Sequence, residues 1–480
     1  MPSAANPLDK EALFARYGER YKWYVMAVAA LGTIGAVLLS TGFNVAVPAL
    51  MKHFGIGSEE VQLAVTSFMV ANTLAMLPTP WLIQRFGLRH CFIYATVLLV
   101  VASIFGSLSP TFPLLLAARI AQGIAAGIMY PIGTYVIMWL FPANKQGRAS
   151  GLLGFAIVLA PAVSPALGGI LIDNFGWESV FFLSLPFSLL AWLGAWLLLP
   201  IPDTQKTADF DWLGMLLLSV MTVALLGCVT HLKGGTTGAG NSLALGETLL
   251  ALVALLWFLR HAARSPGAII SLEMFRRRPL AMGMLVSFIY GFGIYGSTYL
   301  IPLYLQTIIG LSATRAGGVL VPGGLALALT LPLAGYLSDH TSPRLVVMAG
   351  LVLLGASFAG LWLVSARNSS EYYVELTTLG RVGSGLMIAS LSQAAMQGIH
   401  GHLLGQAAMF IGYIRQLGGV LGVACLAVFV GWRAALLGGS AAAHCQAFAE
   451  GFLLSLLVFV FAMVAAQRMK EPAQEVKEAG

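Results

Sequence analysis

Charged residues are scarce in this sequence. Asp, Glu, Lys and Arg together make up 9% of the 480 residues, whereas hydrophobic residues make up 58%. Soluble globular domains carry about a quarter charged residues. The composition therefore excludes an ordinary soluble protein and indicates one that crosses a membrane many times. A net charge of +7 would suit nucleic-acid binding in a soluble chain, but here the basic residues stand between apolar runs, so no nucleic-acid partner is expected.

Motifs that carry chemistry are also missing. The cysteines are Cys91, Cys228, Cys425 and Cys445. Their spacing is unpaired, so neither a disulfide framework nor a metal site is expected. The close histidine pair His400 and His402 has no carboxylate or cysteine beside it. No GxxxxGK[ST] phosphate loop occurs. We therefore expect no enzyme, no bound metal, no cofactor and no direct use of ATP.

Apolar runs long enough to cross about 30 Å of hydrocarbon recur along the chain. The expected spans lie near residues 22–48, 61–83, 91–108, 112–136, 146–172, 178–200, 211–231, 245–264, 279–307, 313–337, 345–365, 372–398, 404–430 and 448–467. We predict an all-α membrane protein with about 14 transmembrane helices. Residues 1–21 lack the apolar core and cleavage site of a signal peptide, and Leu8 to Arg20 is expected to form an amphipathic interfacial helix.

The basic residues divide unevenly between alternate loops. If the N-terminus is cytoplasmic, the loops on that side carry several times as many Lys and Arg residues as those on the other side. Such a bias sets the orientation of membrane proteins. We predict cytoplasmic termini and a multi-pass protein of the bacterial inner membrane.

The chain also repeats itself weakly. Pro80–Arg89 corresponds to Gly335–Arg344, and Arg119–Gly123 corresponds to Arg381–Gly385. Parallel halves around a midplane site are common in secondary transporters. The predicted organisation is an N-terminal segment 1–21, a six-helix bundle 22–200, an inserted helix pair with linkers 201–278, a second six-helix bundle 279–467 and a tail 468–480.

Arginine residues occur inside several predicted spans. An arginine there is costly unless it faces water or a partner, so it marks a functional interior. Arg119, Arg381 and Arg415 lie deepest, whereas Arg315 lies near an outer end and is expected to reach water. We expect the three deep arginines to border a water-accessible passage.

Carboxylates do not match these arginines. The acidic residues at or near span ends are Glu59, Glu60, Asp173, Glu178, Glu247, Glu371, Glu375 and Glu450. Only Glu375 and Glu450 are considered as membrane-embedded, and an interfacial position is favoured for both. The passage should therefore be electropositive or neutral, which favours a neutral or anionic amphiphile over a lipophilic dication.

Other polar and aromatic side chains are further candidates for the cavity. They are Asn44, Asn72, Gln122, Tyr295 and Tyr299. The amide side chains are more often helix–helix contacts than ligands. The two tyrosines are one turn apart, and a pocket is as open for them as a lipid-facing or packing role.

Several stretches together carry a family resemblance. They are Asn44–Pro48, Thr66–Asn72, Trp81–Arg89, Arg119 with Gln122–Gly123, Ala160–Gly169 and Arg415. Over nearly its full length the sequence resembles the fourteen-span drug:proton antiporter branch of the major facilitator superfamily, the EmrB/QacA type. The resemblance implies proton coupling at Arg119 and a flexible, sealing fifth span with Pro161, Pro165, Gly168 and Gly169. It also implies a cytoplasmic gate, formed by Trp81, Arg85, Gly87 and Arg89 in one copy and by Gly335, Asp339 and Arg344 in the other.

The sequence departs from the family pattern in three places. Leu39 stands where the family has a first-span aspartate. Pro80 and Gln84 replace the Gly and Asp of the first gating copy, whereas Asp339 is retained in the second. Ala160 and Ser164 replace glycines in the fifth span. Since the first-span carboxylate is absent, either Glu375 or Glu450 accepts the proton or the coupling differs from that of the family.

We predict a secondary exporter of hydrophobic or amphiphilic small molecules that works by alternating access and proton antiport. Its expected partners are the substrate, protons and the lipid bilayer, and a periplasmic adaptor protein is a further candidate. A dedicated exporter of organic anions, such as fatty acids, siderophores or pigment precursors, is one alternative. A non-transporting membrane scaffold or receptor is the alternative from another class.

Overall fold

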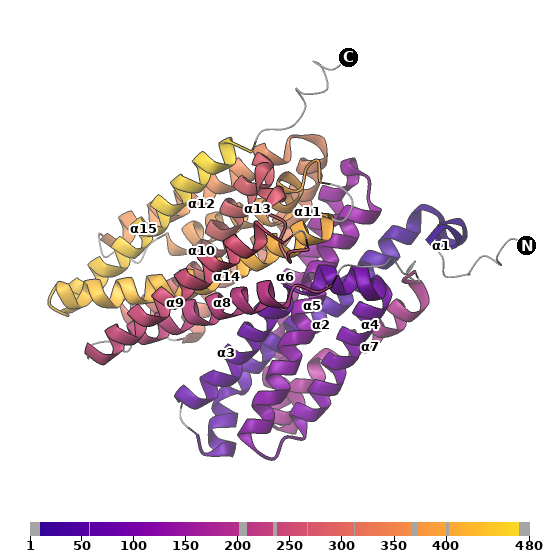
Figure 1. Cartoon of the computed structure of the whole chain (residues 1–480). Coiled ribbons are helices and arrows are strands. Elements are labelled where there is room, and N and C mark those ends of the chain that lie inside the picture. The colour runs from indigo at the N-terminus through magenta and orange to yellow at the C-terminus, as the bar shows by residue number, and fades with distance from the viewer. Residues whose placement is uncertain are drawn as a thin grey trace, which may run out of the picture. The chain divides into compact units, whose positions relative to one another are not determined.

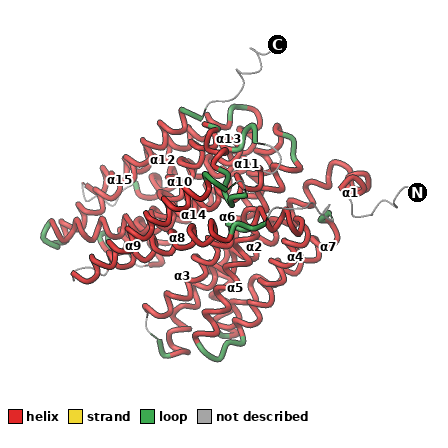
Figure 2. The backbone as a smooth tube through the Cα atoms, viewed as in Figure 1, coloured by secondary structure: helices red, strands yellow, loops and turns green. Residues whose placement is uncertain are grey.

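The computed structural model describes residues 10–56, 58–200, 209–233, 238–265, 267–311, 313–366, 372–399 and 403–469. The described residues form helices and no strand (Figure 2). The helices, traced by colour in Figure 1, are α1 (Lys10–Tyr17), η1 (Gly18–Arg20), α2 (Tyr21–Phe54), α3 (Ser58–Ala75), α4 (Thr79–Ser107), α5 (Phe112–Leu140), α6 (Ala143–Phe175), η2 (Trp177–Ser184), α7 (Leu185–Leu198), α8 (Trp212–Lys233), α9 (Gly238–Ala262), η3 (Leu272–Arg276), α10 (Arg278–Thr307), α11 (Ala313–His340), α12 (Pro343–Ala366), α13 (Tyr373–Ala395), α14 (Leu403–Leu436) and α15 (Ala441–Gln467). His400, His402 and Glu371 lie outside the described residues.

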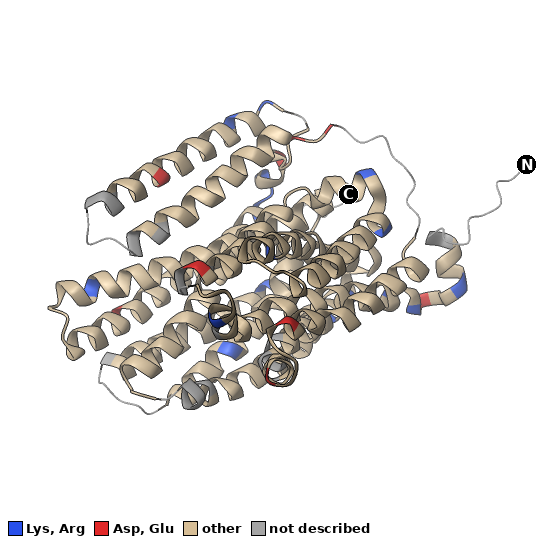
Figure 3. Ribbon diagram, turned by 90° about the horizontal axis from the view of Figure 1, so that it is seen from below, with Lys and Arg blue, Asp and Glu red and all other residues tan. Residues whose placement is uncertain are grey.

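The helices α2 to α15 follow the predicted spans in order. Among the described residues, 10 helices are long and apolar enough to cross a membrane, and shorter apolar segments lie in α3 and α8. Charged residues are few along these helices (Figure 3). The prediction of an all-helical, multi-pass membrane protein is therefore confirmed.

The second predicted span is interrupted, which the sequence analysis did not anticipate. Its helix ends at Ala75, residues 76–78 form turns, and α4 begins at Thr79. Pro78 and Pro80 explain the break, because proline cannot donate the backbone hydrogen bond that continues a helix. Residues 84–90, which separate the second and third predicted spans, are helical as well, apart from one kink at Gly87.

The chain divides into two compact units. The first unit consists of residues 1–143, 153–211 and 404–409. Within it α5 packs against α3, α4 and α2, and α7 packs against α2 and α4. The fully buried rings of Phe43, Phe92 and Phe181 lie in its core.

The second unit consists of residues 144–152, 212–403 and 410–480. Within it α13 packs against α11 and α12, α15 packs against α10 and α12, and α8 pairs with α9. Tyr304 is fully buried and contacts the rings of Tyr373, Phe448 and Phe452. These helices position the polar side chains described next.

Candidate functional site

Arg119 lies in α5 and is almost fully enclosed, with 1% of the residue exposed. Its guanidinium lies between two aromatic rings, 4.0 Å from the centroid of Phe43 and 4.3 Å from that of Phe68. Nε donates to the carbonyl oxygen of Ala64 at 3.2 Å, and Nη1 donates to Oε1 of Gln122 at 2.9 Å. Two cation–π contacts and two hydrogen bonds thus stabilise a buried charge that has no carboxylate partner among the described residues.

Gln122 extends this network to a neighbouring helix. It is 0% exposed, and its Nε2 donates to the carbonyl oxygen of Ala102 and to Oγ of Ser103, both at 3.4 Å. Ser103 in turn lies 3.4 Å from Oγ of Ser184. The groups that contact Arg119 are therefore protein groups. This differs from the prediction that the arginine borders a water-accessible passage. Its role in coupling stays a prediction.

The helices α3 and α5 approach each other closely beside Arg119. A Cβ atom on Gly123 would lie 2.5 Å from the carbonyl oxygen of Phe68, and one on Gly127 would lie 2.2 Å from that of Asn72. Asn72 is buried at 3% exposure, which places it in the helix contact. Small residues four apart allow such close helix packing in membranes. Asn44, by contrast, is exposed on α2.

The second unit carries a polar face at the middle of three helices. We call the residues Tyr295 and Thr298 on α10, Arg381 on α13, and Arg415 and Gln416 on α14 the polar face. Nη2 of Arg381 donates to Oγ1 of Thr298 at 3.2 Å, and the Tyr295 hydroxyl donates to Oε1 of Gln416 at 3.3 Å. Buried Tyr290 lies within electrostatic reach of Arg415, Arg381 and Tyr295. The structure thus places three of the predicted site residues, Tyr295, Arg381 and Arg415, on separate helices of one polar face.

The polar face is accessible and positively charged. Tyr295 is 38% exposed, and Arg381, Arg415 and Gln416 are partly exposed. No ion pair formed by described residues involves either arginine. An accessible guanidinium at mid-span depth is expected to face a water-filled cavity rather than lipid. Tyr299, one turn beyond Tyr295, is partly exposed and extends the same stretch of α10.

The two carboxylates proposed as proton acceptors are placed elsewhere. Glu375 is exposed in the first turn of α13. Glu450 on α15 forms an ion pair with both Nε and Nη2 of Arg433, in the last turn of α14, and accepts from Gln446 at 3.1 Å. Neither shares a hydrogen bond or ion pair with the polar face among the described contacts.

Asp339 holds the first turns of α6. Its Oδ1 accepts from the backbone amide of Gly147 at 2.7 Å and its Oδ2 accepts from that of Arg148 at 2.8 Å. A Cβ on Gly147 would lie 2.5 Å from the carbonyl oxygen of Gly335, and a Cβ on Gly335 would lie 2.2 Å from that of Gly147. A carboxylate near a helix N-terminus is favoured by the unpaired amides and the helix dipole. The end of α11 and the start of α6 are therefore joined by two charge-assisted bonds and a glycine pair. Arg344 is partly buried at the start of α12.

The first copy of the predicted gate is built differently. Gly87 has φ 78°, a left-handed conformation that glycine adopts without strain. Nη2 of Arg89, which is 7% exposed, donates to the carbonyl oxygen of Trp196 at 2.7 Å, near the C-terminus of α7. The Trp81 ring lies 5.0 Å from that of Phe210. Arg85 and Gln84 are exposed.

The fifth predicted span, α6, is helical through Pro161 and Pro165. Oγ of the buried Ser164 donates to the carbonyl oxygen of Leu38 on α2 at 2.7 Å. Gly168 is buried, and a Cβ there would lie 3.5 Å from the carbonyl oxygen of Gly42, whereas Gly169 has no such neighbour within 4 Å. Ser164, which replaces a family glycine, therefore forms a helix–helix bond of its own.

Sequence reasoning missed the aromatic contacts of Arg119 and the position of Glu247. Phe43 and Phe68, the rings around Arg119, both stand in or beside motif stretches that were treated as backbone patterns. Glu247 was assigned to a span end, but α9 begins at Gly238 rather than at 245, so the carboxylate lies inside the helix. A charged residue within an apolar run was the available signal for Glu247.

These observations define a multi-pass helical membrane protein with buried and partly exposed arginines, a class that includes the secondary transporters. A comparison with known families matches residues 29–423 to the Major Facilitator Superfamily, and the chain belongs to that family. Members of this family are transporters and not enzymes. The resemblance inferred from the motifs is confirmed at the level of the superfamily.

Related proteins and structures agree with this assignment. The chain is 25% identical over 456 residues to "Uncharacterized MFS-type transporter YcnB" of Bacillus subtilis, covering 95% of this chain and 96% of that protein. It is 28% identical to "Multidrug resistance protein B homolog" of Mycobacterium tuberculosis, covering 85% of this chain and 76% of that protein. The crystal structure of the human organic anion transporter MFSD10 (TETRAN) shares the fold with a TM-score of 0.67 at 18% identity, covering 91% of this chain and 99% of that one.

Proposed function

We propose that this secondary transporter exports amphiphilic small molecules by alternating access, with proton antiport as its drive. The polar face carries the proposal, because it presents two guanidinium groups, an amide, a phenol and a hydroxyl group at mid-span depth. The name of the Mycobacterium tuberculosis relative, a multidrug resistance protein B homologue, supports export. The motif resemblance to the EmrB/QacA branch supports antiport.

The charge of the polar face favours substrates that bear an acceptor or an anionic group. Arg381 and Arg415 form no ion pair with a described carboxylate, so a substrate anion would find their charge uncompensated. A cationic substrate would have to approach two guanidinium groups without a counter-ion. A dedicated organic-anion exporter is therefore the second candidate function.

In this proposal the contact of Asp339 with α6 forms part of the cytoplasmic gate. Opening the gate on that side would require the two amide bonds of Gly147 and Arg148 to break. Trp81, Arg85, Gly87 and Arg89 would form the first copy of the gate, and α6 from Pro161 to Gly169 would act as the flexible seal. We place both termini in the cytoplasm and the protein in a bacterial inner membrane, with a periplasmic adaptor as a candidate partner.

The test uses proteoliposomes with an imposed pH gradient and three fluorescent amphiphiles that share one aromatic body. One ends in a carboxylate, one in a neutral amide and one in a quaternary ammonium group. We expect the anionic and neutral probes to be transported and the cation to be transported poorly. Replacing Arg381 with Gln should raise KM for the anionic probe about 10- to 100-fold, because a hydrogen bond to a charged group is worth about 1.5–3 kcal/mol.

The matched control is Arg468→Gln, at the exposed end of α15. This change should leave KM for all three probes unaltered. Equal transport of the cation and the anion by the unmodified protein would contradict the proposed charge preference. No movement of any probe under the gradient would instead favour a scaffold or receptor.

A further inference from the structure

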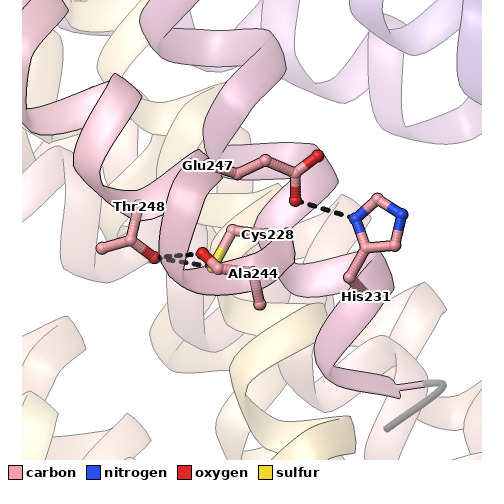
Figure 4. Close-up of polar contacts among 5 residues, drawn as sticks. All are labelled: Cys228, His231, Ala244, Glu247 and Thr248. Atoms are coloured by element: carbon pink, nitrogen blue, oxygen red, sulfur yellow. Dashed lines mark hydrogen bonds and ion pairs between the residues drawn. The ribbon is translucent and has the colours of Figure 1, made fainter. Parts of the chain in front are cut away.

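The inserted helix pair α8–α9 contains an ionisable contact that the proposed transport site does not use. Nδ1 of His231, in the last turns of α8, lies 2.8 Å from Oε2 of Glu247 on α9 (Figure 4). Thr248 adjoins the pair, and its Oγ1 lies 3.1 Å from Sγ of Cys228 and donates to the carbonyl oxygen of Ala244 at 2.8 Å. Most of the other residues of α8 and α9 are apolar.

The carboxylate is positioned by the shape of α8. Gly227 has no side chain, and a Cβ there would lie 2.3 Å from Oε1 of Glu247. The carboxylate therefore occupies the space that any larger residue at 227 would fill. Glu247 lies about 2.5 turns into α9, counted from Gly238 at 3.6 residues per turn. An ionisable residue inside a membrane span is by default functional.

The geometry leaves one nitrogen of His231 free to accept a proton. An ionised carboxylate can only accept hydrogen bonds, so Nδ1 must carry the hydrogen in this contact. Nε2 is then the acceptor, and Figure 4 shows it turned away from Glu247. The side chains of His231 and Glu247 are 41% and 26% exposed, so protons can reach them.

Proton uptake removes the net charge of the His231–Glu247 pair. With neutral imidazole the pair carries one negative charge, and with imidazolium it carries none. Imidazole is the side chain that ordinarily changes charge near physiological pH. Loss of the net charge makes burial of the pair among apolar helices less costly. Among the described residues, the thiol of Cys228 lies beside Thr248, and the thiol of Cys425 on α14 interacts with that of Cys228.

The helix α8 is joined to the helix that carries part of the polar face. Oγ1 of Thr222 lies 2.7 Å from the hydroxyl of Tyr413 on α14, and both residues are buried. Tyr413 precedes Arg415 and Gln416 by two and three positions. A shift of α8 against α9 on protonation can therefore reach the polar face through this hydrogen bond.

We propose that His231 and Glu247 form a proton-binding site in the inserted helix pair, which couples the pH gradient to the polar face through Thr222 and Tyr413. The inference rests on the proposed proton antiport. It assigns the proton acceptor to a residue pair other than Glu375 and Glu450. The end of α8 is expected to lie on the outer side, where an exporter takes up protons.

The experiment compares the unmodified protein with His231→Gln and Glu247→Gln in proteoliposomes. Both substitutions keep hydrogen-bonding capacity at similar size. We measure substrate exchange without a pH gradient, substrate accumulation with one, and proton release on substrate binding to the detergent-solubilised protein. Both variants should keep exchange, lose the response to the gradient and lose the proton release. His444→Gln, a histidine in the first turn of α15, is the matched control and should behave as the unmodified protein.

Two outcomes would overturn the inference. Variants that keep gradient-driven accumulation and proton release would show that the protons bind elsewhere. Variants that lose exchange as well would show that the pair merely holds α8 to α9. If the unmodified protein itself shows neither exchange nor substrate binding, the proposed export function fails rather than the assignment of the proton site.

Discussion

Replacing Asp339 with Asn should weaken the contact between α11 and the start of α6. The carboxylate accepts two backbone amides, at 2.7 and 2.8 Å. An asparagine side chain offers one acceptor oxygen and no charge, so one bond is lost and the other becomes neutral. A hydrogen bond to a charged group is worth about 1.5–3 kcal/mol, and the helix-end charge adds about 0.3–1 kcal/mol. After allowance for partial solvent exposure, we expect a loss of about 2 kcal/mol, or about 30-fold in the opening equilibrium.

Hydrogen exchange measured by mass spectrometry on the peptide that contains Gly147 and Arg148 tests this magnitude. Exchange there should become about 30-fold faster in Asp339→Asn, because exchange through a local opening follows the opening equilibrium. The control is Gln84→Ala, at the corresponding position of the first copy, whose exposed side chain should make no difference. If exchange at the start of α6 is unchanged in both Asp339→Asn and Asp339→Ala, the carboxylate does not hold this helix and our reading of the gate is refuted.

Three further predictions concern the buried contacts. Gly127→Ala should lower the thermal midpoint in detergent, since overpacking costs about 1–3 kcal/mol, whereas Gly169→Ala, which has no neighbour within 4 Å, should not. Arg119→Met should cost about 2–4 kcal/mol by leaving Gln122 and a backbone carbonyl without a donor, and a wild-type midpoint would contradict this. Glu450→Gln should lower the thermal midpoint slightly and leave gradient-driven transport intact, because this carboxylate is held in an ion pair. Loss of the gradient response in this variant would instead identify Glu450 as the proton acceptor.

The span pattern was readable from the sequence because each helix must satisfy its own backbone hydrogen bonds in lipid. Helices α2 to α15 accordingly follow the apolar runs. The boundaries were less accessible. Two prolines split the second span at 76–78, and α4 continues through the predicted gap between the second and third spans with one kink at Gly87.

The partners of the polar side chains were not readable in the same way. The sequence indicated Arg119 as functional, but not that Phe43 and Phe68 enclose it. It indicated Asp339 as part of a gate, but not that the carboxylate binds the amides of Gly147 and Arg148. It placed Glu247 at a span end, whereas in the structure this residue lies inside α9 and contacts His231.

Composition and apolar periodicity by themselves determined that this chain is a many-spanning helical membrane protein, and the motif stretches determined its superfamily. Only the tertiary structure decided which arginines are enclosed and which are accessible, and which carboxylates are held by a partner. The reason is physical: a helix in lipid is specified by its own residues, whereas the cost of a charge depends on the groups that other helices place around it.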